Sequence, residues 1–201
     1  MRPERLWPTA RGAALISLPL LAFGLTVLAS GLLLVVLLLL GGPAGAGKST
    51  LARAWCAARP RAAHVQLDEV RHLIVAGRAD PQQPGPLQGE QYALSVRATV
   101  ALARTFIEGG YDVAVDDVLE PAAFDHYWRP LLDGLDRHLV IVLPDLEEVL
   151  RRSRAREKRV LEHHSGAQHA ACAAWPPEYR IDTTGLTVEE SPALVRRASG
   201  T

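Results

Sequence analysis

The chain has 201 residues, of which 48% are hydrophobic and 22% charged, and its formal net charge is zero. This composition excludes a wholly disordered protein, and the neutral balance gives no sign of the basic surface that nucleic-acid binders carry. The length suits one compact domain with its own core. The two cysteines, Cys56 and Cys172, lie far apart. They fit neither a disulfide framework nor a zinc site and indicate a reducing compartment.

The first part of the chain is apolar without interruption. No charged residue occurs between Gly12 and Pro43, and residues 13–30 are just long enough to cross a bilayer. Arginines precede them, so the positive-inside rule would carry the rest of the chain out of the cytoplasm, which conflicts with the motif that follows. A signal peptide meets the same objection, and an upstream extension that packs as an apolar helix is a third interpretation. We expect a cytoplasmic protein with residues 1–30 as an extension, and membrane association through residues 13–30 stays open.

A phosphate-binding loop follows the apolar run. Residues 42–49 read GPAGAGKS and match the pattern G-x-x-x-x-G-K-[ST]. Residues 32–40 precede it as a buried parallel strand would, and residues 50–58 suit a helix, a context that a chance glycine-rich turn would lack. Lys48 is expected to reach the β- and γ-phosphates, and the Ser49 hydroxyl to bind Mg²⁺. The residues expected to bind the nucleotide are Gly42, Gly45, Ala46, Gly47, Lys48, Ser49 and Thr50.

The scarcity of lysine and the absence of asparagine support this interpretation and narrow the class of nucleotide-binding protein. Among the 22 basic residues the only lysines are Lys48 and Lys158, so a lysine in the loop does not reflect background usage. The chain also contains no asparagine. A GTPase base-recognition motif and the asparagine of a protein-kinase catalytic loop are therefore excluded.

Asp68 follows a second predicted strand, at residues 63–67. Ligands of open α/β sheets bind at the carboxyl ends of the strands, so Asp68 is a candidate general base or a group that orients an acceptor hydroxyl. Capping of a helix is the alternative role. Further on, the proline-rich residues 77–89 are predicted to form a loop on the substrate side, and residues 90–108 a helix.

Two adjacent aspartates end a third predicted strand, at residues 111–115. An apolar strand ending in Asp beside a phosphate-binding loop is the Walker-B arrangement, in which a carboxylate holds Mg²⁺ directly or through water. We favour Asp116 for this role and keep Asp117 as the alternative.

A charged helix, residues 145–159 with Asp145 as its cap, is predicted after a fourth strand at residues 138–143. Arg152 and Arg156 lie four residues apart and share a face of it. A mobile helix that brings arginines onto a transferred phosphoryl group would act as a lid. A solvated basic face is the alternative, because glutamates one turn upstream can pair with the arginines.

The last segments add a fifth strand, residues 180–183, and a closing helix, residues 187–197. Strands alternating with helices favour a parallel α/β sheet. His163, His164 and His169 lack partnering carboxylates at metal-ligand spacing, so we expect surface residues and not a metal site.

The phosphate-binding loop, the DEVR and VDD segments and the pattern R-x-x-x-R-x-K occur in this order. With them the chain resembles the small P-loop kinases and phosphotransferases, in particular the chloramphenicol phosphotransferase and zeta-toxin-like group, often labelled AAA-family ATPases. The resemblance covers residues 32–198. It implies a three-layer P-loop NTPase sandwich with a five-stranded parallel sheet and a helical lid.

The resemblance also implies ATP and Mg²⁺ as cofactors and a small hydroxyl-bearing acceptor of the γ-phosphoryl group. On matching positions it puts Asp68 on the acceptor side and Asp116 on the metal side, with Arg152 and Arg156 in the lid. Arg71 and Arg97 would line the acceptor pocket.

Two other functions remain in competition with a kinase. A P-loop and a Walker-B aspartate also serve an ATPase or nucleotide-dependent switch that acts on a protein partner. A membrane-tethered binding module would require the N-terminal segment to insert. The kinase is favoured by the carboxylate on the acceptor side and by the arginine lid.

Overall fold

The computed structural model describes residues 35–200 except residues 82, 84, 156–161 and 188–189. The predicted N-terminal extension and its membrane-length segment lie outside these residues, and so does Arg156. Within the described residues, no helix combines the length and the apolar character that a membrane crossing needs.

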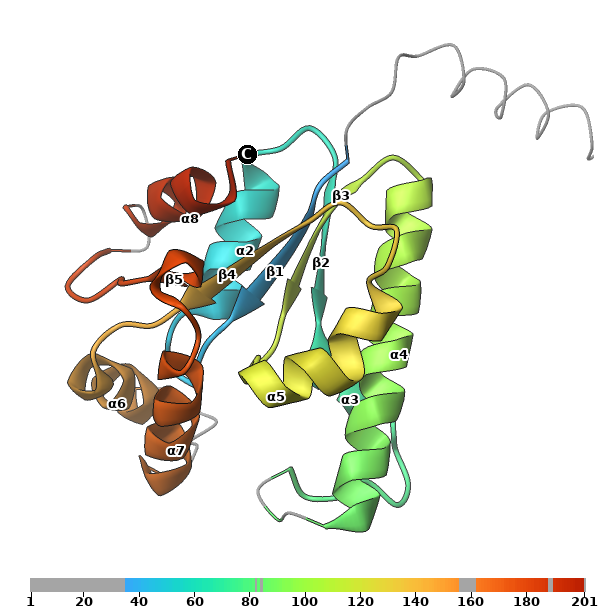
Figure 1. Ribbon diagram of the computed structural model, residues 1–201, viewed down its shortest axis with the longest axis horizontal. Coiled ribbons are helices and arrows are strands. Elements are labelled where there is room, and N and C mark those ends of the chain that lie inside the picture. Colours follow the sequence, from blue (N-terminus) through green and yellow to red (C-terminus); the bar gives the residue numbers. More distant parts are fainter. Residues whose placement is uncertain (1–34, 82, 84, 156–161, 188–189, 201) are drawn as a thin grey trace, which may run out of the picture. The chain divides into compact units, whose positions relative to one another are not determined.

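Five parallel strands form one sheet in the described part of the chain, in the order β2-β3-β1-β4-β5 (Figure 1). The fold predicted from the sequence is thus confirmed. The strands are β1 (Leu37–Gly41), β2 (Ala62–Gln66), β3 (Asp112–Asp116), β4 (Arg137–Val142) and β5 (Arg180–Ile181). Strand β1 pairs with β3 on one side and β4 on the other, so the loop that follows it leaves the middle of the sheet.

Helices cover both faces of the sheet. Helices α2 (Lys48–Ala57) and α8 (Ser191–Ser199) lie on one face, and α4 (Pro86–Glu108) lies on the other (Figure 1). The remaining helical segments are α3 (Leu67–His72), α5 (Pro121–Ala123), a π-helical turn (Phe124–Trp128), a 3₁₀ turn (Arg129–Leu131), α6 (Leu146–Arg154), α7 (Glu162–Ala173) and a second 3₁₀ turn (Pro177–Tyr179).

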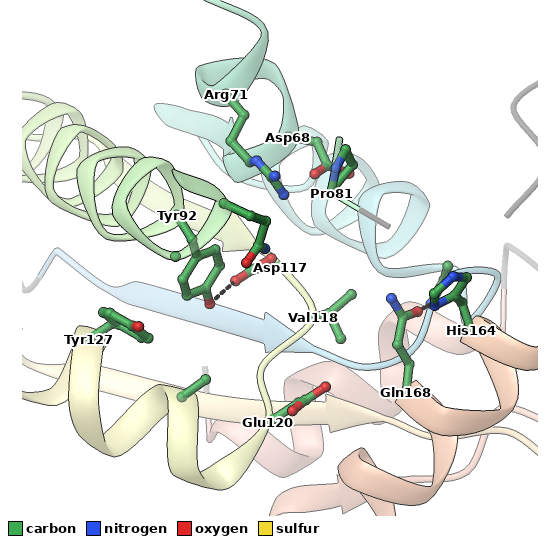
Figure 2. A pocket seen from close by; sticks show the side chains of 14 residues that line it. Asp68, Arg71, Pro81, Tyr92, Asp117, Val118, Glu120, Tyr127, His164 and Gln168 are labelled. Atoms are coloured by element: carbon green, nitrogen blue, oxygen red, sulfur yellow. Dashed lines mark hydrogen bonds between the residues drawn. The ribbon is translucent and has the colours of Figure 1, made fainter. Parts of the chain in front are cut away.

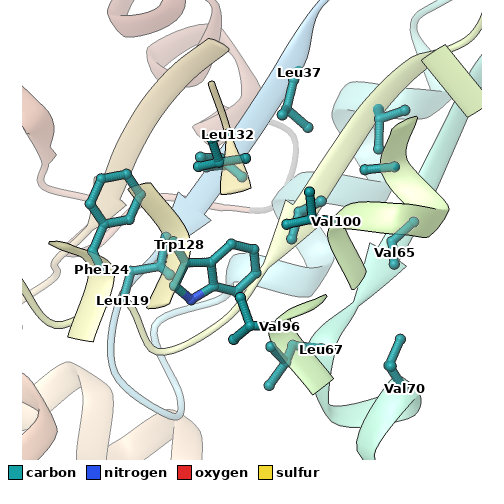
Figure 3. Close-up of a cluster of buried hydrophobic side chains, with 14 of the residues drawn as sticks. Leu37, Val65, Leu67, Val70, Val96, Val100, Leu119, Phe124, Trp128 and Leu132 are labelled. Atoms are coloured by element: carbon teal, nitrogen blue, oxygen red, sulfur yellow. The ribbon is translucent and has the colours of Figure 1, made fainter. Parts of the chain in front are cut away.

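The apolar run of β1 is buried on both faces because its side chains alternate between two cores. Leu37 and Leu39 join the cluster beneath α4, whereas Leu38 and Leu40 join the cluster beneath α2 and α8. Trp128 lies in the α4-side cluster and is fully buried (Figure 3). Burial on both sides fixes the end of β1, and therefore fixes where the phosphate-binding loop begins.

Several predicted boundaries were wrong. Helix α4 begins at Pro86, so the predicted loop at residues 77–89 is shorter than expected; proline is well suited to the first turn of a helix. Helix α3 begins directly after β2, and its N-cap is Gln66. Asp68 therefore lies in the first helical turn, and the alternative that it caps the helix is wrong. The predicted cap of the charged helix is confirmed, since Asp145 occupies the N-cap of α6. Its side chain forms no capping bond, and its backbone N–H donates to Thr184 Oγ1 at 2.8 Å.

Candidate active site

The phosphate-binding loop joins β1 to α2 and turns through glycines with positive φ. The φ angles are 140° at Gly42, 95° at Gly45 and 98° at Gly47, values that L-residues with a Cβ rarely adopt. A Cβ on Gly42 would overlap the carbonyl oxygen of Val142, and one on Gly45 would lie 2.6 Å from that of Val149. At two of the three positions the surrounding backbone itself therefore leaves no room for a side chain.

Lys48 is the first residue of α2, and its side chain turns back across the loop. It is 9% exposed, and its Nζ donates to the carbonyl oxygen of Pro43 at 2.9 Å. Burial lowers the pKa of Lys48, while the nearby carboxylates of Asp116 and Asp117 oppose this shift. The ammonium group thus lies inside the loop, where a phosphate would be received.

Asp116 is the last residue of β3 and is 6% exposed. Side chains two residues apart on a strand point to the same face of the sheet. Ala114 belongs to the cluster beneath α2 and α8, so Asp116 also lies on the face that α2 covers. Its Oδ2 lies 2.7 Å from Nε2 of His64 on the neighbouring strand β2. Sequence reasoning missed His64, because nothing in the order of residues indicates this cross-strand pair.

The residues at this edge fit the oxygen ligands that Mg²⁺ requires. His64 holds one carboxylate oxygen of Asp116. The other carboxylate oxygen and the half-buried hydroxyl of Ser49, in the first turn of α2, are oxygens of the kind that Mg²⁺ binds. No group of three His, Cys, Asp or Glu side chains within the described residues could hold a metal alone. Nucleotide-bound Mg²⁺ needs no such group, since phosphates and water complete its shell.

A cavity of about 420 Å³, here called cavity A, opens on the α4 side of the loop (Figure 2). Asp68 and Arg71 of α3 line it, together with Asp117 just beyond β3. The remaining lining residues are Ala44, Pro81, Gln88, Gly89, Tyr92, Val118, Glu120, Ala123, Tyr127, His164 and Gln168. The structure thus brings together Asp68 and Arg71 as expected, whereas Arg97 is exposed on α4 and is not among the lining residues.

Asp117 points into cavity A and is held by the protein. The hydroxyl of Tyr92 lies 2.7 Å from its Oδ2 (Figure 2). Trp128 Nε1 donates to that hydroxyl at 3.1 Å. Burial raises the pKa of Asp117 to about 6, against the lowering effect of the bonds from Tyr92 and from the backbone of Val118. The two adjacent aspartates therefore serve different faces: Asp116 lies beneath α2, and Asp117 lines cavity A.

A second cavity, of about 370 Å³ and here called cavity B, lies on the other side of the loop. Its lining residues are Gly45, Ala46, Gly47, Thr50, Leu51, Arg151, Arg152, Ala155, Thr183, Leu186, Thr187 and Ser191. Arg152 donates to the carbonyl oxygens of Ala46 at 3.2 Å and Thr183 at 3.0 Å, and its Nε donates to Glu148 at 2.6 Å. The predicted lid arginine is therefore fastened to the phosphate-binding loop at cavity B.

Helix α7 contributes residues to the site that the sequence did not reveal. Gln168 accepts a hydrogen bond of 2.9 Å from the N–H of Ala44 and, like His164, lines cavity A. His163 is exposed, as expected, but His164 and His169 are half-buried. A regular spacing of polar residues on this helix would have been the only signal, and it cannot be separated from that of a solvated helix.

A family model described as an AAA domain matches residues 37–175, more than two thirds of the chain. No curated protein matches the sequence.

Solved structures with low sequence identity share the fold. The tunicamycin resistance protein of Deinococcus radiodurans is 19% identical with a TM-score of 0.63, covering 83% of this chain and 96% of its own. The APS kinase of Mycobacterium tuberculosis, in complex with AMPPNP and APS, is 19% identical with a TM-score of 0.62 and coverages of 83% and 98%. A gluconokinase from Sinorhizobium meliloti 1021 is 11% identical with a TM-score of 0.60 and coverages of 83% and 93%.

These likenesses agree with the fold described above and with its phosphate-binding loop. The chain belongs to the AAA domain family and has the fold of the small P-loop kinases.

Proposed function

We propose that this protein is an ATP-dependent kinase that transfers the γ-phosphoryl group to a hydroxyl group of a small molecule. The observation that carries the proposal is that one loop separates two cavities. Ala44 lines cavity A, whereas Gly45 and Gly47 line cavity B. Both cavities have the volume of small-ligand sites. A donor in cavity B and an acceptor in cavity A would meet at the loop, which would bind the phosphates.

Cavity B suits the nucleoside and cavity A the acceptor. The loop residues from Gly42 to Thr50 would bind the phosphates through their N–H groups, with Lys48 supplying positive charge. Arg152, and Arg156 beyond the described residues, would stabilise charge from the lid side. Ser49 and Asp116 would hold Mg²⁺, which when bound neutralises charge on the phosphates.

Asp68 is our candidate for the group that receives the proton of the acceptor. It lines cavity A, is exposed to it, and lies in the first turn of α3. In the transfer, the acceptor oxygen forms a bond to the γ-phosphorus while the bond from that phosphorus to the bridging oxygen of ADP breaks. The hydroxyl proton passes to the Asp68 carboxylate, and ADP and the phosphate ester leave.

The kinases among the similar structures support this reading over an ATPase or switch, and so does a separate acceptor-sized cavity beside the loop. We further propose that the protein acts in the cytoplasm, where ATP is available. Membrane association through residues 13–30 remains a prediction, which membrane fractionation of the full-length protein would test.

The decisive experiment incubates the full-length protein with Mg²⁺, γ-labelled ATP and a panel of hydroxylated metabolites and antibiotics. Transfer of label to one acceptor, lost in Lys48→Ala and strongly reduced in Asp68→Ala, is the expected result. Label found only in inorganic phosphate, whatever acceptor is added, would favour the ATPase or switch. Unchanged transfer by Asp68→Ala would remove Asp68 from the mechanism.

A further inference from the structure

Three side chains form a hydrogen-bonded path from the protein core to cavity A. Trp128 is fully buried beneath α4, Tyr92 lies on α4, and Asp117 follows β3. Tyr127 meets the ring of Tyr92 edge to face, with ring centres 5.1 Å apart. The position of the Tyr92 hydroxyl is therefore fixed from two sides by aromatic neighbours.

The chemistry of the three groups sets the direction of this path. An indole N–H can only donate, so Trp128 Nε1 must donate to the oxygen of the Tyr92 hydroxyl. The single hydroxyl proton of Tyr92 is then left for Asp117 Oδ2, 2.7 Å away. Asp117 is therefore an acceptor toward the protein.

Asp117 and Asp68 differ in how the protein holds them. The Asp68 side chain is exposed in the first turn of α3 and forms no hydrogen bond or ion pair with other described residues. Asp117 is held by the Tyr92 hydroxyl and still borders the cavity. A freely rotating carboxylate suits proton transfer, whereas a fixed one suits the recognition of a group at a defined place.

We propose that Asp117 is a specificity-determining residue that accepts a hydrogen bond from a second donor group of the acceptor, a hydroxyl or amine near the phosphorylated hydroxyl. Tyr92 and Trp128 are its positioning residues. The acceptor class is then a compound with at least two neighbouring donors, such as a polyol or amino alcohol. This inference rests on the proposed kinase function and deepens it.

The substrate side is tested first, because it requires no variant. The acceptor identified with labelled ATP is compared with analogues in which each remaining donor is replaced in turn by hydrogen or a methyl ether. One replacement is expected to lower kcat/KM by about 10- to 100-fold, as the loss of a hydrogen bond to a charged group does. Equal kcat/KM for every analogue would overturn the inference.

The protein side uses Tyr92→Phe, which removes only the hydroxyl. The expected result is a rise of roughly 3- to 10-fold in the KM for the acceptor with the KM for ATP unchanged. The analogue lacking the second donor should be insensitive to the variant, since Tyr92→Phe acts through the acceptor–Asp117 bond, which that analogue cannot form. Tyr111→Phe is the matched control, because Tyr111 precedes the opposite, amino-terminal end of β3.

A folding defect is separated from a positioning effect by a double variant. Tyr92→Phe leaves the buried Trp128 Nε1 without its partner, whereas Tyr92→Phe with Trp128→Phe removes both polar groups. The rise in acceptor KM should persist in the double variant even if the midpoint of thermal unfolding recovers. Recovery of the KM together with stability would overturn the inference. Absence of transfer by the wild-type protein to any acceptor would instead overturn the proposed function, and this inference with it.

Discussion

The glycines of the phosphate-binding loop are of two kinds at the scale of single residues. Gly45 and Gly47 have nearly equal φ angles, 95° and 98°, but different surroundings. A Cβ on Gly45 would lie 2.6 Å from the carbonyl oxygen of Val149, whereas one on Gly47 would meet nothing nearer than the Arg152 guanidinium at 3.7 Å. The two positions therefore share the cost of a left-handed backbone and differ in the cost of a clash.

Gly45→Ala is expected to lower the free energy of unfolding by at least about 1 kcal/mol more than Gly47→Ala, because only the first substitution forces backbone apart. Urea unfolding of the two variants measures the difference. Gly47→Ala serves as the matched control for the φ penalty alone. Equal losses in both variants would mean that the loop can shift away from α6 at little cost.

Gln91 is a second residue whose role is local and testable. It is 8% exposed, and its side-chain amide donates to Gly77 O at 2.8 Å and accepts from Ala79 N–H at 2.9 Å. Gln91→Leu removes both bonds, so the loop around Arg78 should open more often, at a cost of about 1 kcal/mol. Tryptic cleavage after Arg78 is expected to accelerate several-fold.

The control for this measurement is Gln88→Leu, the same substitution one turn earlier on α4. Gln88 lines cavity A and forms no hydrogen bond with the backbone of the described loop residues. Cleavage at Arg78 that is equally fast in wild type and Gln91→Leu would show that other contacts hold this loop.

Some residues of the candidate site can be predicted from the residues next to them in the sequence, whereas others reach the site only through tertiary packing. Lys48 and Ser49 were predictable because their neighbours in sequence carry the motif, and Asp68 because strand ends converge. Tyr92 and Gln168 were not predictable. Each reaches the site from the interior of a helix, and only tertiary packing decides which helical face meets cavity A.

Helix α7 is the clearest case at the scale of elements. Besides Gln168, its Cys172 lies against the phosphate-binding loop: it is fully buried, and both the Gly42 backbone and the Lys48 charge act on its thiol. Burial raises the pKa of Cys172 to about 12. This helix therefore supports the loop from behind while it lines cavity A.

The raised pKa of Cys172 predicts a pH dependence of stability. The folded protein keeps the thiol proton up to about pH 12, whereas the unfolded chain loses it above about pH 9, so stability falls as pH rises through this window. Between pH 8 and 10 the loss should be about 1 kcal/mol. Urea unfolding at both pH values checks it, with Cys172→Ala as reference, in which this part of the slope is absent. Identical slopes would contradict the burial of a protonated thiol.

Elements were easier to predict than their boundaries. The apolar runs that became β1 and β3 stand out because both faces of the sheet are covered. The start of α4 at Pro86 was missed, since prolines spaced through residues 77–89 read equally well as a loop. The boundary between β2 and α3 was placed one residue too late, because no turn residue separates the two elements.

At the scale of the whole molecule, the two hydrophobic clusters connect the described sheet to the helices on both its faces. Their members run from Val36 to Val195. A chain of residues 31–201 should therefore fold alone, with a single cooperative unfolding transition and a midpoint close to that of the full-length protein. Calorimetry of the two chains tests this, with ATP affinity as a second readout. Aggregation of the shorter chain would show that the first 30 residues complete the fold.

The crowding around Gly42 and Gly45 constrains which residues related proteins can carry at these two positions. A related protein that lost its nucleotide would still need glycine at these two positions to connect its strand to its helix, because the neighbouring backbone excludes a side chain there. Lys48, whose burial is unfavourable without a phosphate, would be under no such constraint. Among distant relatives, glycines at both positions would then indicate the same fold, whereas a lysine at the position of Lys48 would indicate that nucleotide binding was retained.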